Sequence, residues 1–314
     1  MLDIDTFLIT LYVTIDDFCR ERRQSELEPV RPGPEARLSP SEVMTLALFG
    51  QLSRFRSERD FYRFAKDDLG HLFPNLPDRV GFNRHLREQQ EAIVAFFHHL
   101  TERLEGKHCA FEIVDRVGAP TRFRSRRGVG WLPEYTDKGW CGRLGWFHGF
   151  HLLTVVNPEG VITGIGIGPA SAKDQPLMDA VLQARHTQDP RCPLVGTPAL
   201  GGDYIADAGF IGEDWERRWR SLFDVGVTSP PRPCDAKKLR WPKALRRWHA
   251  SLRQIIESVH DKLLNTFRLD KERPHDIRGF FARVSAKVAL HNFCIWINRQ
   301  YGRQPMQFAD LIGW

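Results

Sequence analysis

The segment GGDYIADAGF, residues 201–210, places two carboxylates in a short apolar run that otherwise predicts a buried strand. An unpaired buried carboxylate is costly to remove from water. Asp203 and Asp207 must therefore reach solvent at the strand ends or meet a cation. Asp207 is the stronger candidate for a functional site, because it leaves the strand and ligands in open α/β sheets gather beyond the carboxyl ends of strands. Asp203 remains the alternative.

Two further acids follow apolar elements. Asp115 ends the predicted strand CAFEIVD, and Glu257 lies in the predicted helix LRQIIESVHDKLLNTF, whose apolar residues recur at helical spacing. Strand ends and a flanking helix can bring Asp115, Asp207 and Glu257 together at one edge of a sheet. There they would repel one another unless they shared divalent cations. Such cations can clamp the attacking and leaving oxygens of a phosphodiester, so the pattern predicts metal-dependent chemistry on nucleic acid.

The helix around Glu257 carries a polar stripe. Arg253, Glu257 and Asp261 are spaced by four residues and therefore share one face. An ordinary ion pair on a surface helix would explain the first two residues, and Asp261 competes with Glu257 for the role of the third acid. We expect Arg253 to face DNA instead, because a guanidinium can hold a phosphate through two hydrogen bonds.

Basic residues with interleaved tryptophans precede this helix, in the segment RPCDAKKLRWPKALRRWH at 232–249. Phosphates pair with Lys and Arg and an unpaired base stacks on Trp, so DNA contact is expected, with a solvated surface as the alternative. The stretch TRFRSRRG after Asp115 supports the same interpretation, and the net charge of +6 favours a polyanionic partner. The expected DNA-binding residues, besides Arg253, are Lys237, Lys238, Arg240, Trp241, Lys243, Arg246, Arg247, Arg124, Arg126 and Arg127.

The elements that position these residues fall into two parts. Residues 1–106 read as an all-helical domain, in which Ser39, Pro40 and Glu42 mark a helix start with a capping box, and one long helix is expected from residue 82 to about 104. Arg and Lys side chains at 54–66 make this domain the candidate reader of DNA ends. Residues 107–314 alternate strand and helix patterns and predict an α/β domain.

Within this α/β part, the turn signal NPEG joins two strands over residues 144–170. Residues 118–146 lack periodicity and are expected to form a loop. Helices are expected at 174–186, near 212–222, at 242–268 and at 276–301.

In order along the chain, the motifs IVD, WFHGFHL, NPEGVITG, PASAKD, ADAGFIG and RQIIE resemble the DDE transposases of bacterial insertion sequences, and most closely the insertion-sequence-982 type. The resemblance covers roughly residues 105–300. It implies an RNase H-like mixed sheet flanked by helices and preceded by the helical domain. It also implies that Asp115, Asp207 and Glu257 take the first, second and third catalytic positions.

The same resemblance implies two Mg²⁺ ions, with Mn²⁺ as a substitute, and cut-and-paste transposition in which a homodimer brings two transposon ends together. The expected partners are the transposon ends and the target DNA. Two alternative functions are compatible with the same pattern of charges: a metal-dependent nuclease without strand transfer, and a DNA-binding protein that has lost turnover.

Other signals exclude several classes of protein. The six cysteines are scattered without a CxxC pair, so reduced thiols are expected, and the histidines near Cys109 lack the spacing of a structural zinc site. No apolar run approaches the roughly 18 to 20 residues of a membrane span. We expect a soluble cytoplasmic protein, associated with the nucleoid and with no membrane partner.

Overall fold

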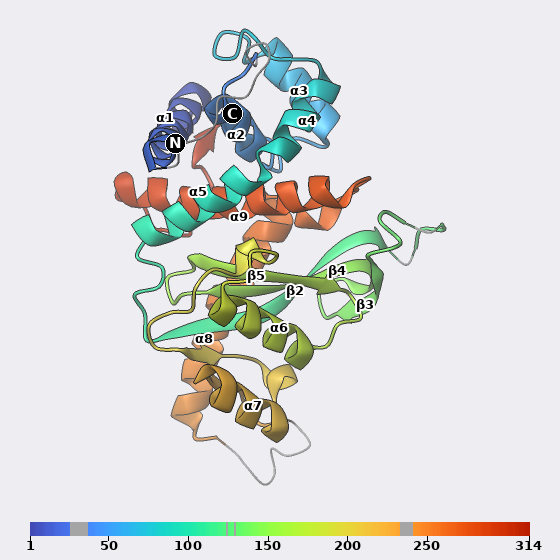
Figure 1. Ribbon diagram of the computed structural model, residues 1–314, viewed down its shortest axis with the longest axis vertical. Coiled ribbons are helices and arrows are strands. Elements are labelled where there is room, and N and C mark those ends of the chain that lie inside the picture. The colour runs from blue at the N-terminus through green and yellow to red at the C-terminus, as the bar shows by residue number, and fades with distance from the viewer. Residues whose placement is uncertain (26–36, 124, 129, 233–240) are drawn as a thin grey trace. The chain divides into compact units, whose positions relative to one another are not determined.

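The computed structural model describes residues 1–25, 37–123, 125–128, 130–232 and 241–314. Over these described residues the chain divides into two compact units (Figure 1). The first unit comprises residues 1–100, 266–268 and 276–314, and the second comprises residues 101–265 and 269–275. No helix in the described part of the chain is both long and apolar enough to cross a membrane.

The first unit is built from helices. The capping box predicted at the second helix is confirmed: Glu42 donates its backbone N–H to Ser39 Oγ at 3.2 Å, and the Glu42 carboxylate accepts from the Ser39 N–H at 2.6 Å. A short parallel pair of strands joins the two ends of the chain. The elements are α1 (Ile4–Ser25), α2 (Pro40–Phe49), α3 (Glu58–Asp67), α4 (Arg79–Glu88), most of α5 (Gln90–Arg103), α9 (Ile277–Gln300), β1 (Leu2–Asp3) and β8 (Ile312–Gly313).

The single long helix expected from residue 82 to 104 is wrong, because the structure has α4 and α5 there. Gln89 leaves helical geometry between them, with φ −88° and ψ 6°. The apolar spacing continues across the break, which is why periodicity alone did not reveal it.

The last helix packs within the first unit. Phe293 of α9 meets Phe7 edge to face, with ring centroids 5.6 Å apart, and Lys287 donates to Gln51 Oε1 at 2.7 Å in the buried interior. The helix is buried almost all round, so it must be covered on every side. The expected division at residue 106 left this helix with the catalytic domain, whereas the compact units group it with the N-terminal helices. The functions assigned to the two parts remain predictions.

The second unit holds a mixed sheet in the order β3–β4–β2–β6–β7, with β5 also paired to β4. Strand β4 is antiparallel to β2, β3 and β5, whereas β6 is parallel to β2 and β7 is parallel to β6. This is an RNase H-like arrangement, so the predicted fold class is confirmed. The strands are β2 (Phe111–Phe123), β3 (Asp137–Cys141), β4 (Gly145–Val156), β5 (Ile162–Pro169), β6 (Asp203–Ile205) and β7 (Gly226–Thr228).

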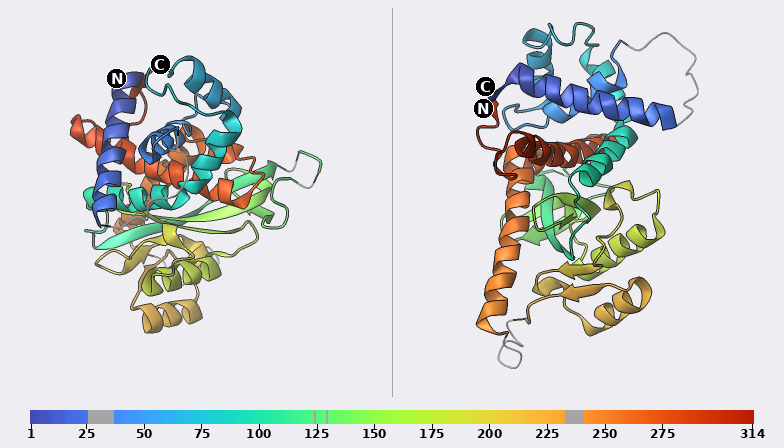
Figure 2. Two further views of the ribbon diagram at one scale, coloured as in Figure 1. Left: turned by 45° about the horizontal axis from the view of Figure 1, so that its top comes forward. Right: turned by 90° about the vertical axis from the view of Figure 1, so that its left-hand side faces the viewer.

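Helices cover both faces of this sheet. The long helix α8 (Lys243–Asp261) lies along one face, and α6 (Asp174–Thr187) and α7 (Glu213–Phe223) lie on the other (Figure 2). Short helical turns precede and follow β6, at Pro193–Val195 and Ala208–Phe210, and two more follow α8, a π-helical turn at Lys262–Thr266 and a 3₁₀ turn at Leu269–Lys271.

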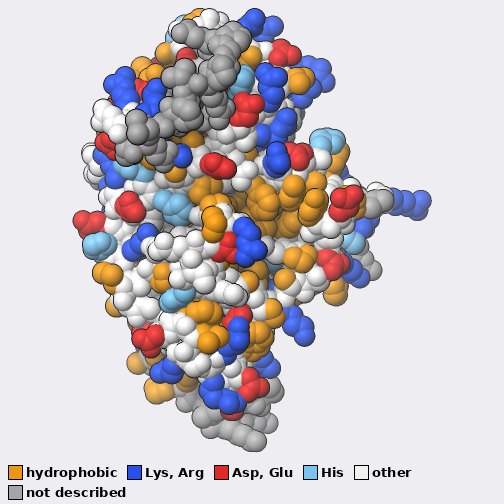
Figure 3. Space-filling model, in the orientation of Figure 1, with side chains coloured by type: hydrophobic (Ala, Val, Ile, Leu, Met, Phe, Trp, Pro, Cys, Tyr) orange, Lys and Arg blue, Asp and Glu red, His pale blue; other side chains and the backbone are white. Residues whose placement is uncertain are grey.

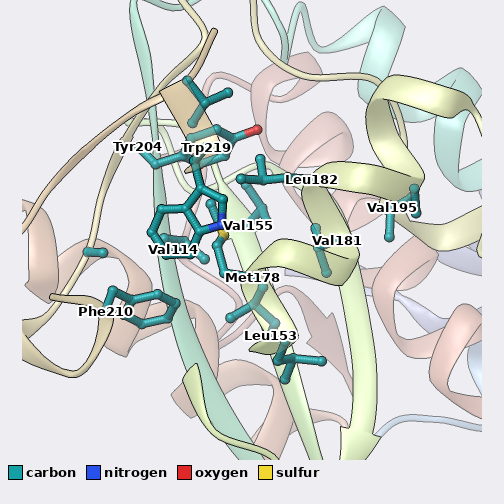
Figure 4. Close-up of a cluster of buried hydrophobic side chains, with 14 residues drawn as sticks. Val114, Leu153, Val155, Met178, Val181, Leu182, Val195, Tyr204, Phe210 and Trp219 are labelled. Carbon is teal, nitrogen blue, oxygen red and sulfur yellow. The ribbon is translucent and has the colours of Figure 1, made fainter. Parts of the chain in front are cut away.

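A buried apolar cluster fills the space between the sheet and α6 and α7 (Figure 4). Trp219 of α7 is fully buried there, and its indole N–H donates to Asp179 at 3.2 Å. Val114 of β2 belongs to this cluster. Since side chains alternate along a strand, the next residue, Asp115, points to the opposite face, toward α8.

Two expectations about β2 are wrong. The strand does not end at Asp115 but continues to Phe123, and residues 118–146 are not a continuous loop, because they include the rest of β2 and all of β3. Both result from pairing with the long strand β4, which continues the ladder past Asp115 as far as Phe123. Such pairing between distant segments leaves no local pattern in the sequence.

Candidate active site

The parallel strands β2 and β6 bring two acids to the same level of the sheet. Ile113 and Ile205 are aligned partners, and Asp115 and Asp207 each lie two residues further on. Asp207 follows the end of β6 and caps the short turn Ala208–Phe210, where its Oδ1 accepts from the Gly209 N–H at 2.8 Å. Asp115 lies within β2, and its Oδ1 accepts from the Arg116 N–H at 2.7 Å.

Burial and the neighbouring charge of Asp207 change the acidity of Asp115. The pKa of Asp115 is raised from its ordinary value to about 7. Burial is the main cause and the charge of Asp207 is the second, while the Arg116 N–H and the Arg253 guanidinium act in the opposite direction. A carboxyl with so high a pKa at the side of another carboxylate is a common feature of functional sites.

Helix α8 carries the third acid, Glu257, and Arg253 of the same helix lies between Glu257 and Asp115. Arg253 Nη2 lies 3.8 Å from Asp115 Oδ2 and 3.5 Å from Glu257 Oε1, so these two carboxylate oxygens are no further apart than the sum of these distances. The Glu257 side chain is 57% exposed, compared with 18% for Asp115. Within the described part of the chain, no group of three or more His, Cys, Asp or Glu is arranged to hold one metal ion.

The two competing acids lie elsewhere. Asp203 begins β6, is exposed, and aligns with Phe111 rather than with Asp115. Asp261 accepts from Arg143 Nη2 at 3.0 Å and from Asn265 Nδ2 at 2.8 Å. The structure therefore places Asp207, and not Asp203, beside Asp115.

A fourth acid, Asp174, was missed in the sequence. It is the first residue of α6 and pairs with Arg116, the residue after Asp115. Burial raises the pKa of Asp174, opposed by Arg116, and the charge of Asp207 raises it further. An acid in the first turn of a helix is favoured by the helix dipole alone, so the position of Asp174 in the sequence did not indicate a functional role. Its position in the motif PASAKD was the one signal that could have identified it.

Gly209 allows the two carboxylates of Asp174 and Asp207 to approach the same turn. A Cβ at position 209 would collide with Asp174 Oδ2 and would lie 2.9 Å from Asp207 Oδ1. Arg116 anchors Asp174 from the other side, because it also donates to the Ala172 carbonyl at 2.5 Å and approaches His151 Nδ1 at 3.3 Å. The absence of a side chain at 209 is thus part of the geometry of the site.

His260 lies on α8 near the same charges. Burial, followed by the charges of Arg143 and Arg253, lowers its pKa to about 3, so the ring is neutral. Its Nε2 is buried and has no hydrogen-bond partner among the described residues. His260 is thus a buried, neutral side chain.

The predicted DNA-binding residues are partly described. Arg124, Lys237, Lys238 and Arg240 lie outside the described residues. Trp241 packs edge to face against His249, with centroids 5.5 Å apart, while the side chains of Lys243, Arg246 and Arg247 are exposed at the start of α8. Arg126 and Arg127 are exposed in the loop after β2, which projects at the right of Figure 1, with basic side chains at its tip in Figure 3.

Two solved structures are similar over most of their length: the Mos1 mariner paired end complex with Mn and the Mos1 transposase paired-end complex with left transposon end. The first is 10% identical, with a TM-score of 0.21, and covers 78% of this chain and 85% of that one. The second is 10% identical, with a TM-score of 0.19, and covers 79% and 84%. Likenesses this weak carry no conclusion about this chain.

None of the curated proteins matches the chain. The family model of the transposase DDE domain, in contrast, matches residues 113–293, which is more than half of the 314 residues. The matched region runs from the strand that carries Asp115 into α9 and includes every acid of the candidate site. This chain therefore belongs to the family defined by the transposase DDE domain.

Proposed function

We propose that this protein is a transposase of the insertion-sequence-982 type that cleaves DNA at transposon ends and joins them to target DNA. The observation that carries the proposal is the alignment of Asp115 and Asp207 on neighbouring parallel segments, with Arg253 between Asp115 and Glu257. All four residues lie inside the region matched by the transposase family model. We infer that the protein works on DNA as a homodimer, in the cytoplasm at the nucleoid.

The acids fit a divalent cation in their chemistry. Carboxylate oxygens are the ligands that Mg²⁺ and Mn²⁺ prefer. The raised pKa of Asp115 supports the same assignment, because it reflects a crowded, poorly solvated pair of acids that a cation would stabilise in the ionised form. Asp115 would hold both ions, Asp207 one and Glu257 the other. When bound, the ions would activate water or a 3′ hydroxyl for attack on a phosphodiester.

Each remaining residue has a role that its environment supports. Arg253, whose side chain is 37% exposed, can exchange its carboxylate partners for a DNA phosphate. The Gly209 N–H orients the Asp207 carboxylate. The basic residues at the start of α8 and in the loop after β2 would follow the DNA backbone. The exposed Arg and Lys side chains at 54–66 in the helical unit are the candidate readers of the transposon end.

Cleavage and joining of a labelled transposon end, with Mg²⁺ or Mn²⁺, test the proposal. Replacement of Asp115, Asp207 or Glu257 by Ala should abolish both reactions and leave DNA binding intact. Asp261→Ala is the matched control, since Asp261 lies on the same helix one turn after Glu257 and should be dispensable for cleavage. Retention of cleavage by all three variants would refute the assignment.

The same assay separates the two alternative functions. Supplying a pre-cleaved end with a free 3′ hydroxyl isolates the joining step. Cleavage without joining would indicate a nuclease. Binding without cleavage by the unaltered chain would indicate a DNA-binding protein that has lost turnover.

A further inference from the structure

The hairpin formed by β3 and the first half of β4 has two unlike faces. Trp140 is paired directly with Trp146, and Lys138 with His148, so these four side chains share one face. The opposite face carries Phe147, which is 1% exposed, and Gly139, where an added Cβ would collide with the backbone of Ala170. The hairpin is therefore anchored by one face, and the other is left open.

The open face is aromatic. Trp140 is 55% exposed and Trp146 is 47% exposed. Two large aromatic side chains that lie side by side and remain exposed form a contiguous apolar surface, which is typical of a binding site. Their exposure is a consequence of the strand pairing, which directs both indoles away from the buried face.

Positive charge accompanies the two indoles. Lys138 Nζ lies 4.6 Å from the centre of the Trp146 ring, within the range of a cation–π contact. Arg122 of β2 is the register partner of His148, which continues the same face by one strand. Burial, followed by the charge of Arg122, lowers the pKa of His148, so its ring is neutral at neutral pH. The chemistry of this face is that of flat aromatic rings beside cations.

The turn of the hairpin is attached to the helix that carries Glu257. Arg143, in the turn between β3 and β4, pairs with Asp261 of α8 at 3.0 Å, and Asp261 lies one helical turn beyond Glu257. Arg143 and Arg253 both lower the pKa of His260, a side chain of the same helix. The aromatic face thus belongs to an element whose turn reaches the helix of the candidate active site, within the same compact unit.

We propose that this face binds an unpaired nucleotide of the DNA substrate, whose base stacks on Trp140 and Trp146 while the adjoining phosphates pair with Lys138 and Arg122. Stacking requires an accessible face of a base, which a single strand offers and the interior of a duplex does not. The proposal rests on the proposed function in so far as DNA is the substrate. Trp140, Trp146 and Lys138 lie outside the basic segments identified in the sequence, and only Arg122 belongs to one of them, the stretch TRFRSRRG.

Binding to oligonucleotides tests the site without any cleavage. The full chain, in EDTA, is titrated against a fluorescein-labelled 15-nucleotide oligo(dT) and against a duplex of the same length. Replacing both tryptophans, Trp140→Ala with Trp146→Ala, should weaken single-strand binding by at least about fivefold, as expected for the loss of base stacking. Duplex affinity should remain within about twofold, since little of it depends on stacking.

Three variants make the result specific. Trp140→Phe with Trp146→Phe retains a flat ring at both positions and should keep most of the single-strand affinity. Lys138→Gln should reduce the salt dependence of binding, because one phosphate contact is lost. Leu222→Ala, which removes an exposed apolar side chain at the end of α7, should change neither affinity. Circular dichroism confirms that each variant is folded.

Unchanged single-strand affinity of the double alanine variant would overturn the proposal, as would an equal loss of duplex affinity. A change of oligomeric state on size-exclusion chromatography, with single-strand affinity retained, would show that the face instead binds a second copy of the chain. Repeating the titration on an Asp115→Ala background separates this site from the proposed catalytic one. The stacking contact should persist there, even if the unaltered chain proves unable to cleave DNA.

Discussion

Asp115 and Asp207 lie at equivalent positions on neighbouring parallel segments, each two residues beyond the aligned pair Ile113 and Ile205. Because both side chains leave the backbone at the same level, their charges oppose each other in a partly dry environment. The arrangement is unfavourable for a protein without bound cations and useful for one that binds them. Its cost should be measurable as a dependence of stability on pH.

The first prediction concerns this pH dependence. Asp115 has a pKa of about 7 in the folded protein, far above its value in the unfolded chain, so the folded state holds a proton that the unfolded state releases. Stability without metal should therefore fall as pH rises from about 4 to about 7, by up to about 4 kcal/mol from this group. Asp115→Asn removes the ionisation and should make the protein more stable than the unaltered chain at pH 8, with a smaller difference at pH 5.

Urea unfolding in EDTA at the two pH values measures this difference. Mn²⁺ should then stabilise the unaltered chain at pH 8 and have little effect on Asp115→Asn. An equal difference in stability at both pH values would show that Asp115 is not the titrating group.

A second prediction concerns Gly209. Gly209→Ala introduces a Cβ that collides with the Asp174 carboxylate and crowds that of Asp207. Asp174 cannot easily withdraw, because Arg116 pairs with it. We expect a loss of stability of about 1–3 kcal/mol, as for other overpacked sites, and a loss of cleavage of at least about tenfold as Asp207 is displaced.

Gly142→Ala is the matched control for this variant. An added Cβ at position 142 would have no neighbour within 4 Å, so cleavage and stability should not change. Normal cleavage by Gly209→Ala would mean that the position of Asp207 tolerates the added methyl group.

The parts of this structure that were foreseeable from the sequence depend on neighbouring residues. The turn between β4 and β5 was predicted from NPEG, and there Asn157 Oδ1 accepts from the backbone N–H groups of Glu159 and Val161, at 3.0 and 2.9 Å. The capping box of Ser39 is of the same kind. In both cases the residues that carry the signal are those that make the contacts.

The parts that were not foreseeable depend on partners far along the chain. The extension of β2 past Asp115 requires β4, and the break at Gln89 leaves the apolar spacing intact. The carboxylate cluster contains residues that the sequence identified and one that it did not. Asp115, Asp207 and Glu257 stood out in apolar elements, whereas Asp174 had an ordinary explanation as an acid in the first turn of a helix.

A third prediction concerns a buried ion pair behind the site. Arg185 of α6 pairs with Glu112 of β2 at 2.5 Å, and both side chains are almost fully buried. Arg185 also donates to the Tyr204 hydroxyl at 2.7 Å, which links α6 to β2 and β6, the two strands that lead to Asp115 and Asp207. Arg185→Met leaves Glu112 without its partner and should lower the free energy of unfolding by about 3–5 kcal/mol.

Chemical denaturation measures this effect, and Arg191→Met is the control, because Arg191 forms its ion pair with Asp189 at the surface. That variant should have nearly unchanged stability. Combining Arg185→Met with Glu112→Leu should recover much of the loss, since no unpaired charge then remains buried. No recovery would indicate that Arg185 acts through its bonds to Tyr204 and the Val195 carbonyl instead.

The last prediction concerns Arg253, which lies between Asp115 and Glu257. If its guanidinium passes from these carboxylates to a DNA phosphate, two opposite effects follow from one substitution. Arg253→Gln should bind Mn²⁺ more tightly, because a competing positive charge is removed, yet should cleave DNA at least about tenfold more slowly, because a bidentate phosphate contact is lost. Arg253→Lys keeps the positive charge but cannot form the bidentate phosphate contact, so it should cleave at an intermediate rate.

Calorimetric titration with Mn²⁺ and single-turnover cleavage measure the two effects separately. Weaker Mn²⁺ binding by Arg253→Gln would show that the guanidinium organises the carboxylates rather than competing with the cation.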